Sequence, residues 1–495
     1  MRIPGKPWLL MILALNWACP VHRYPASPPV SARGAAAETT QKAMSVRARP
    51  AAVHEAASAG LADVRAAVAA ARSGDTVAVP AGSVRWDDQL VLTKSVSLVG
   101  AGPGQTRITS GFAGTVYGDD NYLLRYDISG DAAKSFRVSG FTWDCGGLCE
   151  GVIIRNHAGA AGAARIRIDH CEFQNFQTRT SARMLVTWGI VWGVVDNCVF
   201  QADDSASAFR ILSPYGANDL SWTETPYEFG NADSLYFEDN IFNILNMPIT
   251  GNAAGRYVMR HNTFNYTGGS GLYTLYLLDN HGNSAPTAGA NGHHSGMGLE
   301  FYENTINLGG LNLNLLDLRG GKALVYNNYA VNCGAVIESK CREEYSDYNN
   351  PPAVHPVNGQ PQHVSDFYTW NTFRNGEKYI NPSSRHPWVQ VPFVLDYGYG
   401  QLVPYPDRQF WFENPRFDGT ANFPYQLETP KGKVAVQVAG MGVGPLASRP
   451  ATCTVEGAGW WSTDESKLYR WRRGVWEPYY TPYAYPHPLR ALTSD

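Results

Sequence analysis

The sequence predicts an all-β fold of the solenoid class, a right-handed parallel β-helix with an N-terminal capping helix and an aromatic-rich C-terminal cap. Three observations lead to this prediction. A short phrase of the form apolar-x-x-Asn-x-Phe recurs along the chain, a helical pattern precedes the first copies, and no Pro/Ser-rich linker divides the 495 residues. Stacked coils escape the usual size limit of a domain because each coil buries its apolar face against its neighbours.

The first residues are typical of an export signal. Arg2 and Lys6 precede the apolar run 8–18, which is too short to span a bilayer. We expect residues 1–37 to be a signal peptide and residues 38–60 to be a flexible N-terminal segment. The mature protein is then secreted, to the periplasm or the extracellular space.

A lipoprotein anchored at Cys19 is the alternative, which Asn16 disfavours because a lipobox usually has Leu at that position. No later segment is apolar enough to span a membrane. Four of the 40 Lys and Arg residues and none of the 43 acids precede residue 38, so the mature chain carries a formal charge of −7. Nucleic acid is not expected as a partner, because phosphate binding needs a basic face. We expect a monomer.

The helical pattern opens the solenoid. Apolar residues recur at helical spacing at Leu61, Val64, Ala67, Val68 and Ala71, and Gly74 ends the helix. Strand-like runs follow at residues 76–79, 90–92 and 96–99, separated by turn signals. A helix at this place covers the open end of the first coil.

The recurring phrase occupies residues 168–173, 195–200, 237–242, 259–264, 301–306 and 325–329, with a looser copy at 369–373. We expect the residue three before each Asn to point inward, and the asparagines to form a ladder in which stacked amides satisfy one another. The ladder comprises Asn240, Asn262, Asn304 and Asn328. Cys171 and Cys198 replace Asn in the first copies, so they lie on neighbouring coils, either as a disulfide or as buried thiols.

Residues 61–375 are therefore expected to form the β-helix. The segment 376–495 is rich in Pro, Tyr and Trp. We interpret it as a C-terminal cap that folds back along the solenoid, with a separate aromatic carbohydrate-binding module as the alternative.

Two stretches near the start carry a family resemblance. Residues 63–82 and 98–102, with Gly74-Asp75-Thr76-Val77 and Leu98-Val99-Gly100-Ala101-Gly102, resemble the beginning of pectate-lyase-like right-handed parallel β-helix proteins. The Asn-x-Phe phrases continue this resemblance to about Phe373. That superfamily includes polysaccharide lyases, hydrolases, epimerases and phage tail fibres, so the resemblance implies a fold and a polysaccharide substrate without fixing the activity.

Candidate catalytic residues come from a second phrase, present at residues 275–282 and 313–320. If Leu278 and Leu316 point inward, alternation along the strands turns the polar residues of both phrases outward on neighbouring coils. The expected catalytic patch comprises Asp279, His281, Asp317, Arg319 and, on the next face of the coil, a solvent-facing Glu300. Glycines 282, 320 and 321 are expected to leave room for a sugar ring, and the loop 283–298, with His293 and His294, to cover bound substrate.

This patch suits cleavage of an acidic, uronate-containing polysaccharide by β-elimination. A cation must neutralise the uronate carboxylate and a base must take the neighbouring proton. Arg319 matches a carboxylate with its planar fork, and His281 titrates near neutrality. Arginine acts as the base in pectate lyase relatives, so the two roles are exchangeable.

Two other functions stay open. A glycoside hydrolase needs two carboxyl groups, which Asp279, Asp317 and Glu300 or the pair Asp203 and Asp204 would supply. In a lyase we expect Asp203, Asp204 and Arg210 to bind the substrate together with His293 and His294. A non-catalytic, glycan-binding solenoid is the third possibility. Ca²⁺ is the candidate cofactor, through Asp119-Asp120 or Asp203-Asp204. No Cys/His cluster has zinc spacing.

Overall fold

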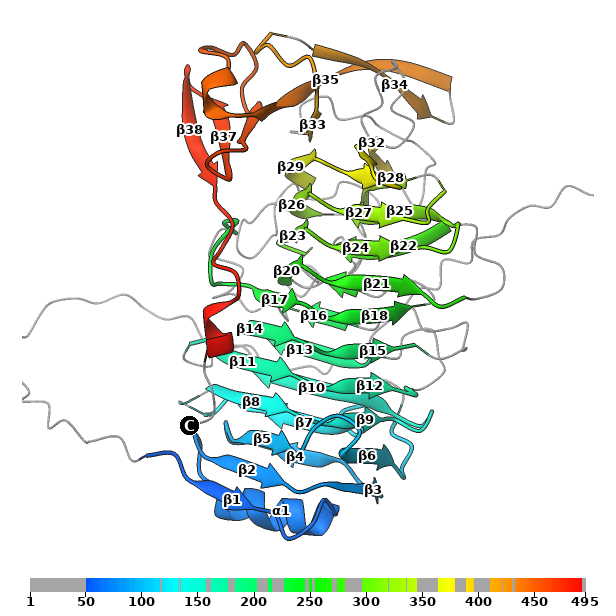
Figure 1. The fold of residues 1–495 in the computed structure, drawn as a ribbon, viewed down its shortest axis with the longest axis vertical. Coiled ribbons are helices and arrows are strands. Elements are labelled where there is room, and N and C mark those ends of the chain that lie inside the picture. The colour runs from blue at the N-terminus through cyan, green and yellow to red at the C-terminus, as the bar shows by residue number, and fades with distance from the viewer. Residues whose placement is uncertain are drawn as a thin grey trace, which may run out of the picture.

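The backbone forms a stack of parallel β-coils. A computed structural model describes residues 50–115, 118–131, 133, 135–156, 162–176, 183–202, 212–215, 227–244, 249–251, 254–268, 274–280, 296–318, 320–334, 336–344, 364–378, 389–395, 410–420, 422–429 and 432–491. Their strands lie in sheets of 17, 10 and 11 strands, here called A, C and B, and the coils stack along the long axis (Figure 1). The prediction of an all-β parallel β-helix is confirmed.

A typical coil contributes one strand to each sheet, in the chain order C, A, B. The coil strands of sheet A are β1 (Val53–Glu55), β2 (Thr76–Val79), β5 (Ser97–Gly100), β8 (Ser135–Ser139), β11 (Ala164–Asp169), β14 (Val191–Asp196), β17 (Leu235–Glu238), β20 (Arg256–Arg260), β23 (Gly298–Tyr302), β26 (Gly321–Tyr326), β29 (Val364–Trp370) and β33 (Phe410–Glu413). Sheet C comprises β4 (Leu90–Leu92), β7 (Tyr122–Asp127), β10 (Glu150–Asn156), β13 (Leu185–Gly189), β16 (Leu212–Tyr215), β19 (Ile249–Gly251), β22 (Thr274–Asn280), β25 (Asn312–Leu318), β28 (Val336–Glu344) and β32 (Val389–Leu395). Sheet B comprises β3 (Gly82–Trp86), β6 (Thr106–Ser110), β9 (Thr142–Asp144), β12 (Glu172–Gln174), β15 (Val199–Gln201), β18 (Ile241–Ile244), β21 (Thr263–Tyr266), β24 (Thr305–Asn307), β27 (Tyr329–Val331), β30 (Phe373–Arg374) and β31 (Glu377–Lys378).

Helix α1 (Leu61–Ala70) covers the first coil, as the apolar spacing predicts. It buries Val64, Ala67 and Val68 in the same apolar cluster that fills the solenoid. Among the described residues, no helix has the length and apolar character needed to cross a membrane.

The N-terminal boundary differs from the prediction of a flexible segment 38–60. Residues Val53–Glu55 form β1, which pairs in parallel with β2. The Asp75 carboxylate anchors this strand, because it accepts the Ala52 N–H at 2.9 Å and lies 3.1 Å from His54 Nε2. The predicted signal peptide lies outside the described residues.

The expected end of the solenoid at residue 375 is also wrong. Strand β32 pairs in parallel with β28, and β33 pairs in parallel with β29, so sheet C continues to Leu395 and sheet A to Glu413. Coils stack through backbone hydrogen bonds, which need no Asn phrase, and the fading of the phrase therefore did not mark the end of stacking.

The Asn ladder is present as predicted. Asn262 and Asn304 are buried, and each donates its side-chain N–H to the amide oxygen of the next ladder residue at 3.0 and 3.1 Å. The residue before each ladder position has a positive φ, such as +58° at His261 and +56° at Glu303, which makes the tight bend from sheet A to sheet B. The apolar residues three before, among them Met259 and Phe301, lie in the core.

Replacing Asn304 with Leu is expected to lower the free energy of unfolding by roughly 1–3 kcal/mol, because buried donors lose their acceptor. Asn304 Oδ1 accepts from both the backbone N–H and the side chain of Asn262. Urea unfolding measures the loss. The matched control is Asn307→Leu, at a half-buried position on β24. Equal stability of the two variants would contradict the ladder's energetic role.

Cys171 and Cys198 occupy the first ladder positions as free, buried thiols. Burial and the neighbouring Cys171 raise the pKa of Cys198 well above its ordinary value. Cys145, Cys149 and Cys453 are likewise free and buried. Of the two interpretations open for the ladder pair, the structure has the buried thiols.

The C-terminal part contains β34 (Asn422–Thr429) and β35 (Gly432–Gly444), an antiparallel pair, followed by β36 (Gly459–Ser462), β37 (Lys467–Arg472) and β38 (Val475–Tyr480). Short 3-10 helices follow β35, as η2 (Leu446–Ser448), and end the described chain, as η3 (Pro488–Ala491). Residues 481–491, here called the strap, run back from the top of the stack along the outer face of sheet A to β14 (Figure 1).

Hydrogen bonds hold the strap to neighbouring coils of sheet A. Arg260 on β20 donates to the carbonyls of Tyr483 and Ala484 at 2.6 Å, and Glu238 on β17 accepts the His487 N–H at 3.0 Å. Burial and two nearby arginines, Arg260 and Arg490, lower the pKa of His487 to about 4. The outer face of sheet A is thus covered by chain from the far end of the molecule.

Candidate functional site

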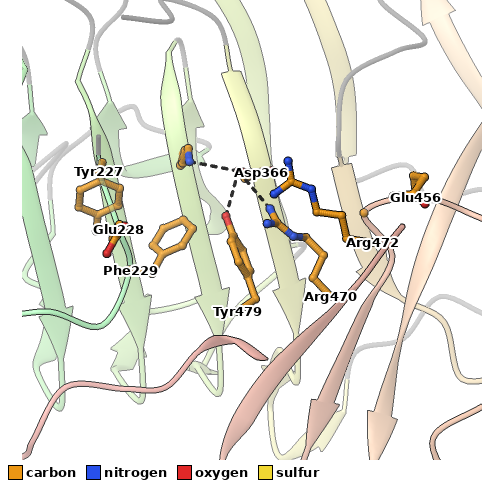
Figure 2. Close-up of a pocket in the computed structure, with 10 residues that line it drawn as sticks. Tyr227, Glu228, Phe229, Asp366, Glu456, Arg470, Arg472 and Tyr479 are labelled. Carbon is orange, nitrogen blue, oxygen red and sulfur yellow. Dashed lines mark hydrogen bonds and ion pairs between the residues drawn. The ribbon is translucent and has the colours of Figure 1, made fainter. Parts of the chain in front are cut away.

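A pocket of about 620 Å³ lies between sheet A and the hairpin β37–β38. Its size falls in the range of small-molecule sites. We call it the bulge pocket, and it is lined by Tyr227, Glu228, Phe229, Lys322, Asp366, Glu456, Gly457, Arg470, Arg472 and Tyr479. Figure 2 shows that these side chains come from the solenoid on one side and the hairpin on the other.

A β-bulge places Asp366 at the centre of this pocket. The register between β26 and β29 shifts between Gly321 and Ala323, which pair with Val364 and Phe367, so two residues of β29 oppose Lys322 alone. Asp366 sits in this bulge with φ +46°. Bulges re-aim side chains and are common beside functional sites.

The Asp366 carboxylate gathers three side chains from different elements. It accepts a hydrogen bond from Tyr479 Oη at 2.9 Å and lies 3.2 Å from Lys322 Nζ and 3.9 Å from Arg470 (Figure 2). Burial and the Asp366 charge raise the pKa of Tyr479 well above its ordinary value. Tyr479 is therefore a neutral phenol that donates a hydrogen bond.

Arginines and aromatic rings form the hairpin wall. The Arg470 guanidinium lies 4.0 Å from the centre of the Tyr479 ring and 3.0 Å from Glu477. Arg472, on the same strand, keeps 51% of its side chain exposed. Arg472 lies 4.0 Å from Glu477, so the wall presents a half-buried guanidinium and a more exposed one that share this acid.

The opposite wall is the segment Tyr227–Gly230. The Tyr227 ring packs on the backbone of β23, because a Cβ added at Gly298 would lie 2.2 Å from it. Phe229 packs edge to face on Tyr227 at 5.2 Å and on Tyr479 at 6.1 Å. Close packing without a side chain at residue 298 therefore fixes this wall on the solenoid.

The predicted catalytic patch is brought together in part. Leu278 pairs with Leu316 in the core, and Asp279 pairs with Asp317 across β22 and β25, so the two phrases stack in register as expected. Both aspartates are buried, with 1% and 3% exposure, and do not face open solvent. Strand alternation predicts which residues pair, but not what covers the face they lie on.

Glu300 differs most from its prediction. Its neighbours Leu299 and Phe301 do point into the core, but Glu300 is only 1% exposed. The Tyr480 hydroxyl, from the end of β38, donates to its carboxylate at 2.8 Å. The C-terminal part of the chain covers the face of sheet A that the sequence left open.

The other predicted site residues lie outside the described residues. These are His281, Arg319, His293, His294, Arg210, Asp203 and Asp204. Their roles stay predictions.

The patch and the bulge pocket belong to the same corner of the coil, where the chain passes from sheet C to sheet A. Asp317 is near the end of β25, and Lys322, which lines the pocket, is near the start of β26. The Asn280 side chain donates to the Gly320 carbonyl at 2.5 Å and joins the corners of adjacent coils.

The glycines of this corner serve packing and not substrate access. Gly320 and Gly321 are buried. Gly321 has φ +76°, and a Cβ there would lie 2.1 Å from the Gly296 carbonyl oxygen. The prediction that these two glycines leave an open surface for a sugar ring is wrong.

One candidate calcium pair is described and does not fit the ion. Asp119 forms an ion pair with Arg155 and lies 3.5 Å from Arg125, while Asp120 accepts the Thr115 hydroxyl at 2.8 Å. Two arginines beside Asp119 would repel a divalent cation. The described residues contain no group of three or more His, Cys, Asp or Glu side chains placed to hold a metal ion.

Comparison with known proteins leaves the activity open. No family model matches the chain, and no curated protein matches its sequence. Among solved structures it is similar to ORF18 of Geobacillus virus E2, with 12% identity, a TM-score of 0.38, and coverage of 84% of this chain and 82% of that chain. A likeness this low carries no functional argument, so the function is argued from the residues of this chain.

Proposed function

We propose that this chain is a secreted enzyme of the pectate-lyase-like superfamily that cleaves a uronate-containing polysaccharide by β-elimination, with a sugar unit held in the bulge pocket. The observation that carries this proposal is the bulge, which turns Asp366 into a pocket walled by aromatic rings and lined by charges of both signs. Ligand sites in proteins are concave, with apolar walls and a few convergent polar groups.

The pocket suits a sugar with a carboxylate. Tyr227, Phe229 and Tyr479 line the pocket, and of these rings Tyr479 keeps part of its surface exposed to a sugar ring, whereas Tyr227 and Phe229 are buried. Arg472 is the exposed guanidinium of the pocket, and its planar fork matches a carboxylate with two hydrogen bonds. Carboxylates and carbonyls on the pocket wall accept hydrogen bonds from sugar hydroxyls.

The reaction requires a base that takes the C5 proton of the uronate. The electron pair forms a C4–C5 double bond, the bond from C4 to the glycosidic oxygen breaks, and that oxygen takes a proton. We assign the base and the neutralising cation to His281 and Arg319, in either order. Arg319 lies in the sequence between Asp317, near the end of β25, and Lys322, which lines the pocket.

Elimination is favoured over hydrolysis because carboxylates of the pocket already bind other protein groups. Hydrolysis needs a pair of carboxyl groups free for proton transfer and attack. Asp366 already receives Tyr479 and Lys322, and both Glu456 oxygens accept the Arg473 N–H, at 2.9 and 3.1 Å. Asp366 and Glu456 are thus engaged in holding the pocket together, which leaves Glu228 as a single further carboxylate of the lining where hydrolysis needs a pair.

A screen of uronate-containing and neutral polysaccharides tests the proposal. We expect a product whose ultraviolet absorbance reports the new double bond. New reducing ends without that absorbance would identify a hydrolase. Binding without cleavage would identify a glycan-binding solenoid, and neither binding nor cleavage of any glycan would overturn the proposal.

The pocket itself is tested by Arg472→Ala. Loss of a hydrogen bond to a charged group is expected to weaken sugar binding about 10- to 100-fold, measured by calorimetry or as KM. The control is Arg473→Ala, since Arg473 is an exposed arginine at the next position that does not line the pocket. Equal affinity of the two variants would move the binding site elsewhere.

A further inference from the structure

Glu300 lies beneath the bulge pocket and contacts both of its walls. Glu300 Oε1 accepts the backbone N–H of Gly230 at 2.7 Å, and Oε2 accepts the Tyr480 hydroxyl at 2.8 Å. Gly230 directly follows the wall segment Tyr227–Phe229, and Tyr480 directly follows Tyr479 of the hairpin wall. Each carboxylate oxygen therefore holds one wall.

The two walls also meet above this carboxylate. Gly230 has φ +73°, and a Cβ there would lie 2.0 Å from the Thr481 carbonyl oxygen. The Phe229 and Tyr480 rings pack edge to face at 6.1 Å. A shift of either wall relative to β23 would therefore move aromatic rings that border the pocket.

We propose that Glu300 is a positioning residue that sets the separation of the two pocket walls through its carboxylate, and thereby the affinity of the pocket for a sugar. The proposal rests on the proposed function in that the pocket holds a sugar unit. Glu300 itself does not line the pocket.

The protonation state of Glu300 changes how firmly it holds the walls. Burial raises the pKa of Glu300 to about 7. When ionised, it accepts two charge-assisted hydrogen bonds, which are stronger than neutral ones. When protonated, it donates to Tyr480, whose hydroxyl then turns to Tyr326 Oη at 2.8 Å, and the bonds become neutral.

Sugar affinity is therefore expected to rise as the pH rises through about 7. The titratable and charged groups that act on Glu300 from the surrounding elements are Arg260, Tyr227, Tyr236, Tyr302, Tyr326 and Tyr480. Burial raises the pKa of each of these tyrosines, and Arg260 stays charged, so Glu300 is the group among them that titrates near neutrality.

Three variants separate positioning from simple packing. Glu300→Gln accepts from Gly230 and donates to Tyr480, as the protonated acid does, so its affinity should be independent of pH and equal to the low-pH affinity of the wild type. Tyr480→Phe releases only the hairpin wall. The control is Glu303→Gln, an acid in the bend directly after the same strand that lies 3.0 Å from His261 and does not line the pocket.

The experiment combines two measurements on the full chain. The first is the affinity for oligogalacturonate and oligoalginate, measured from two pH units below to two above the Glu300 pKa of about 7. Over this range the affinity of the wild type should change about tenfold, and the affinity of Glu300→Gln should stay constant. The second, without sugar, is amide hydrogen exchange at residues 227–230 and 479–481. Glu300→Gln above the pKa should speed exchange in both segments, and Tyr480→Phe in the second alone.

The two measurements distinguish failure of the proposed function from failure of the proposed role of Glu300. A wild type that binds neither sugar overturns the substrate class, while faster exchange in Glu300→Gln still supports positioning of the walls. The role of Glu300 would be overturned if Glu300→Gln left hydrogen exchange unchanged in both segments, whether or not a sugar binds. It would also be overturned if the affinities of Glu300→Gln and the wild type had the same pH dependence.

Discussion

Arg260→Met is expected to lower the free energy of unfolding by about 3 kcal/mol and to release the strap from sheet A. Arg260 is completely buried and forms an ion pair with Glu238, with Nε at 2.9 Å from its carboxylate. Removing one partner of a buried ion pair costs about 3–5 kcal/mol because the other charge stays buried. Arg490 lies 3.2 Å from Glu238 and remains as a partner, so the lower end applies.

The release of the strap follows from the other contacts of Arg260. Its guanidinium donates to the Tyr483 and Ala484 carbonyls. A Met side chain has no donor for these carbonyls. Urea unfolding gives the free energy, and limited proteolysis at the C-terminus reports the strap. The control is Arg165→Met on β11, where an exposed guanidinium lies 5.6 Å from the Trp192 ring and its loss should cost less than about 1 kcal/mol.

A double variant separates the contribution of the ion pair from that of the other contacts of Arg260. Arg260→Met combined with Glu238→Gln should cost less than the sum of the single losses, because the unpaired charge is gone. Additive losses together with an intact, protease-resistant strap in Arg260→Met would show that this arginine does not hold the strap.

His281→Ala and Arg319→Ala are each expected to lower kcat about 10²–10⁴-fold, the usual loss when a group that transfers a proton or balances developing charge is removed. Both residues follow closely on Asp279 and Asp317, which pair across neighbouring strands. The predicted outward orientation of both side chains implies little change in the free energy of unfolding, because surface substitutions stay within about 0.5 kcal/mol.

The kinetic pattern distinguishes these variants from the pocket variant. Arg472→Ala should raise KM with kcat nearly unchanged, because it removes an interaction present before and during the reaction. Full activity of His281→Ala and Arg319→Ala would move the chemistry elsewhere. The segment with Asp203, Asp204 and Arg210 would be the next to test, by the same substitutions to Ala.

Much of the solenoid could be predicted because its contacts repeat along the chain. The ladder residue Asn304 bonds to Asn262 and Asn328, which belong to neighbouring copies of one phrase. The pairing of Asp279 with Asp317 follows from the same kind of copy. Stacking adjacent copies of a repeat is enough to place such residues side by side.

The bulge pocket was missed because no repeat connects its walls. Asp366 lies just before the looser copy of the phrase at 369–373, and Tyr479 lies in the segment 376–495 that is rich in Pro, Tyr and Trp. These two residues are 113 positions apart and bond directly. The aromatic residues of this segment indicate that it packs against another part of the chain, but they do not indicate which part.

The sequence by itself determined the parallel β-helix, its capping helix, the ladder and the register of the coils, since these depend on period and on neighbouring copies. Only the tertiary structure decided that sheet A is covered, that Glu300 is buried with a raised pKa, and that Asp366 faces a pocket. The physical reason is that the hairpin and strap bond to coils up to 323 residues away, through Arg490 and Arg167, and no local periodicity encodes contacts of that range.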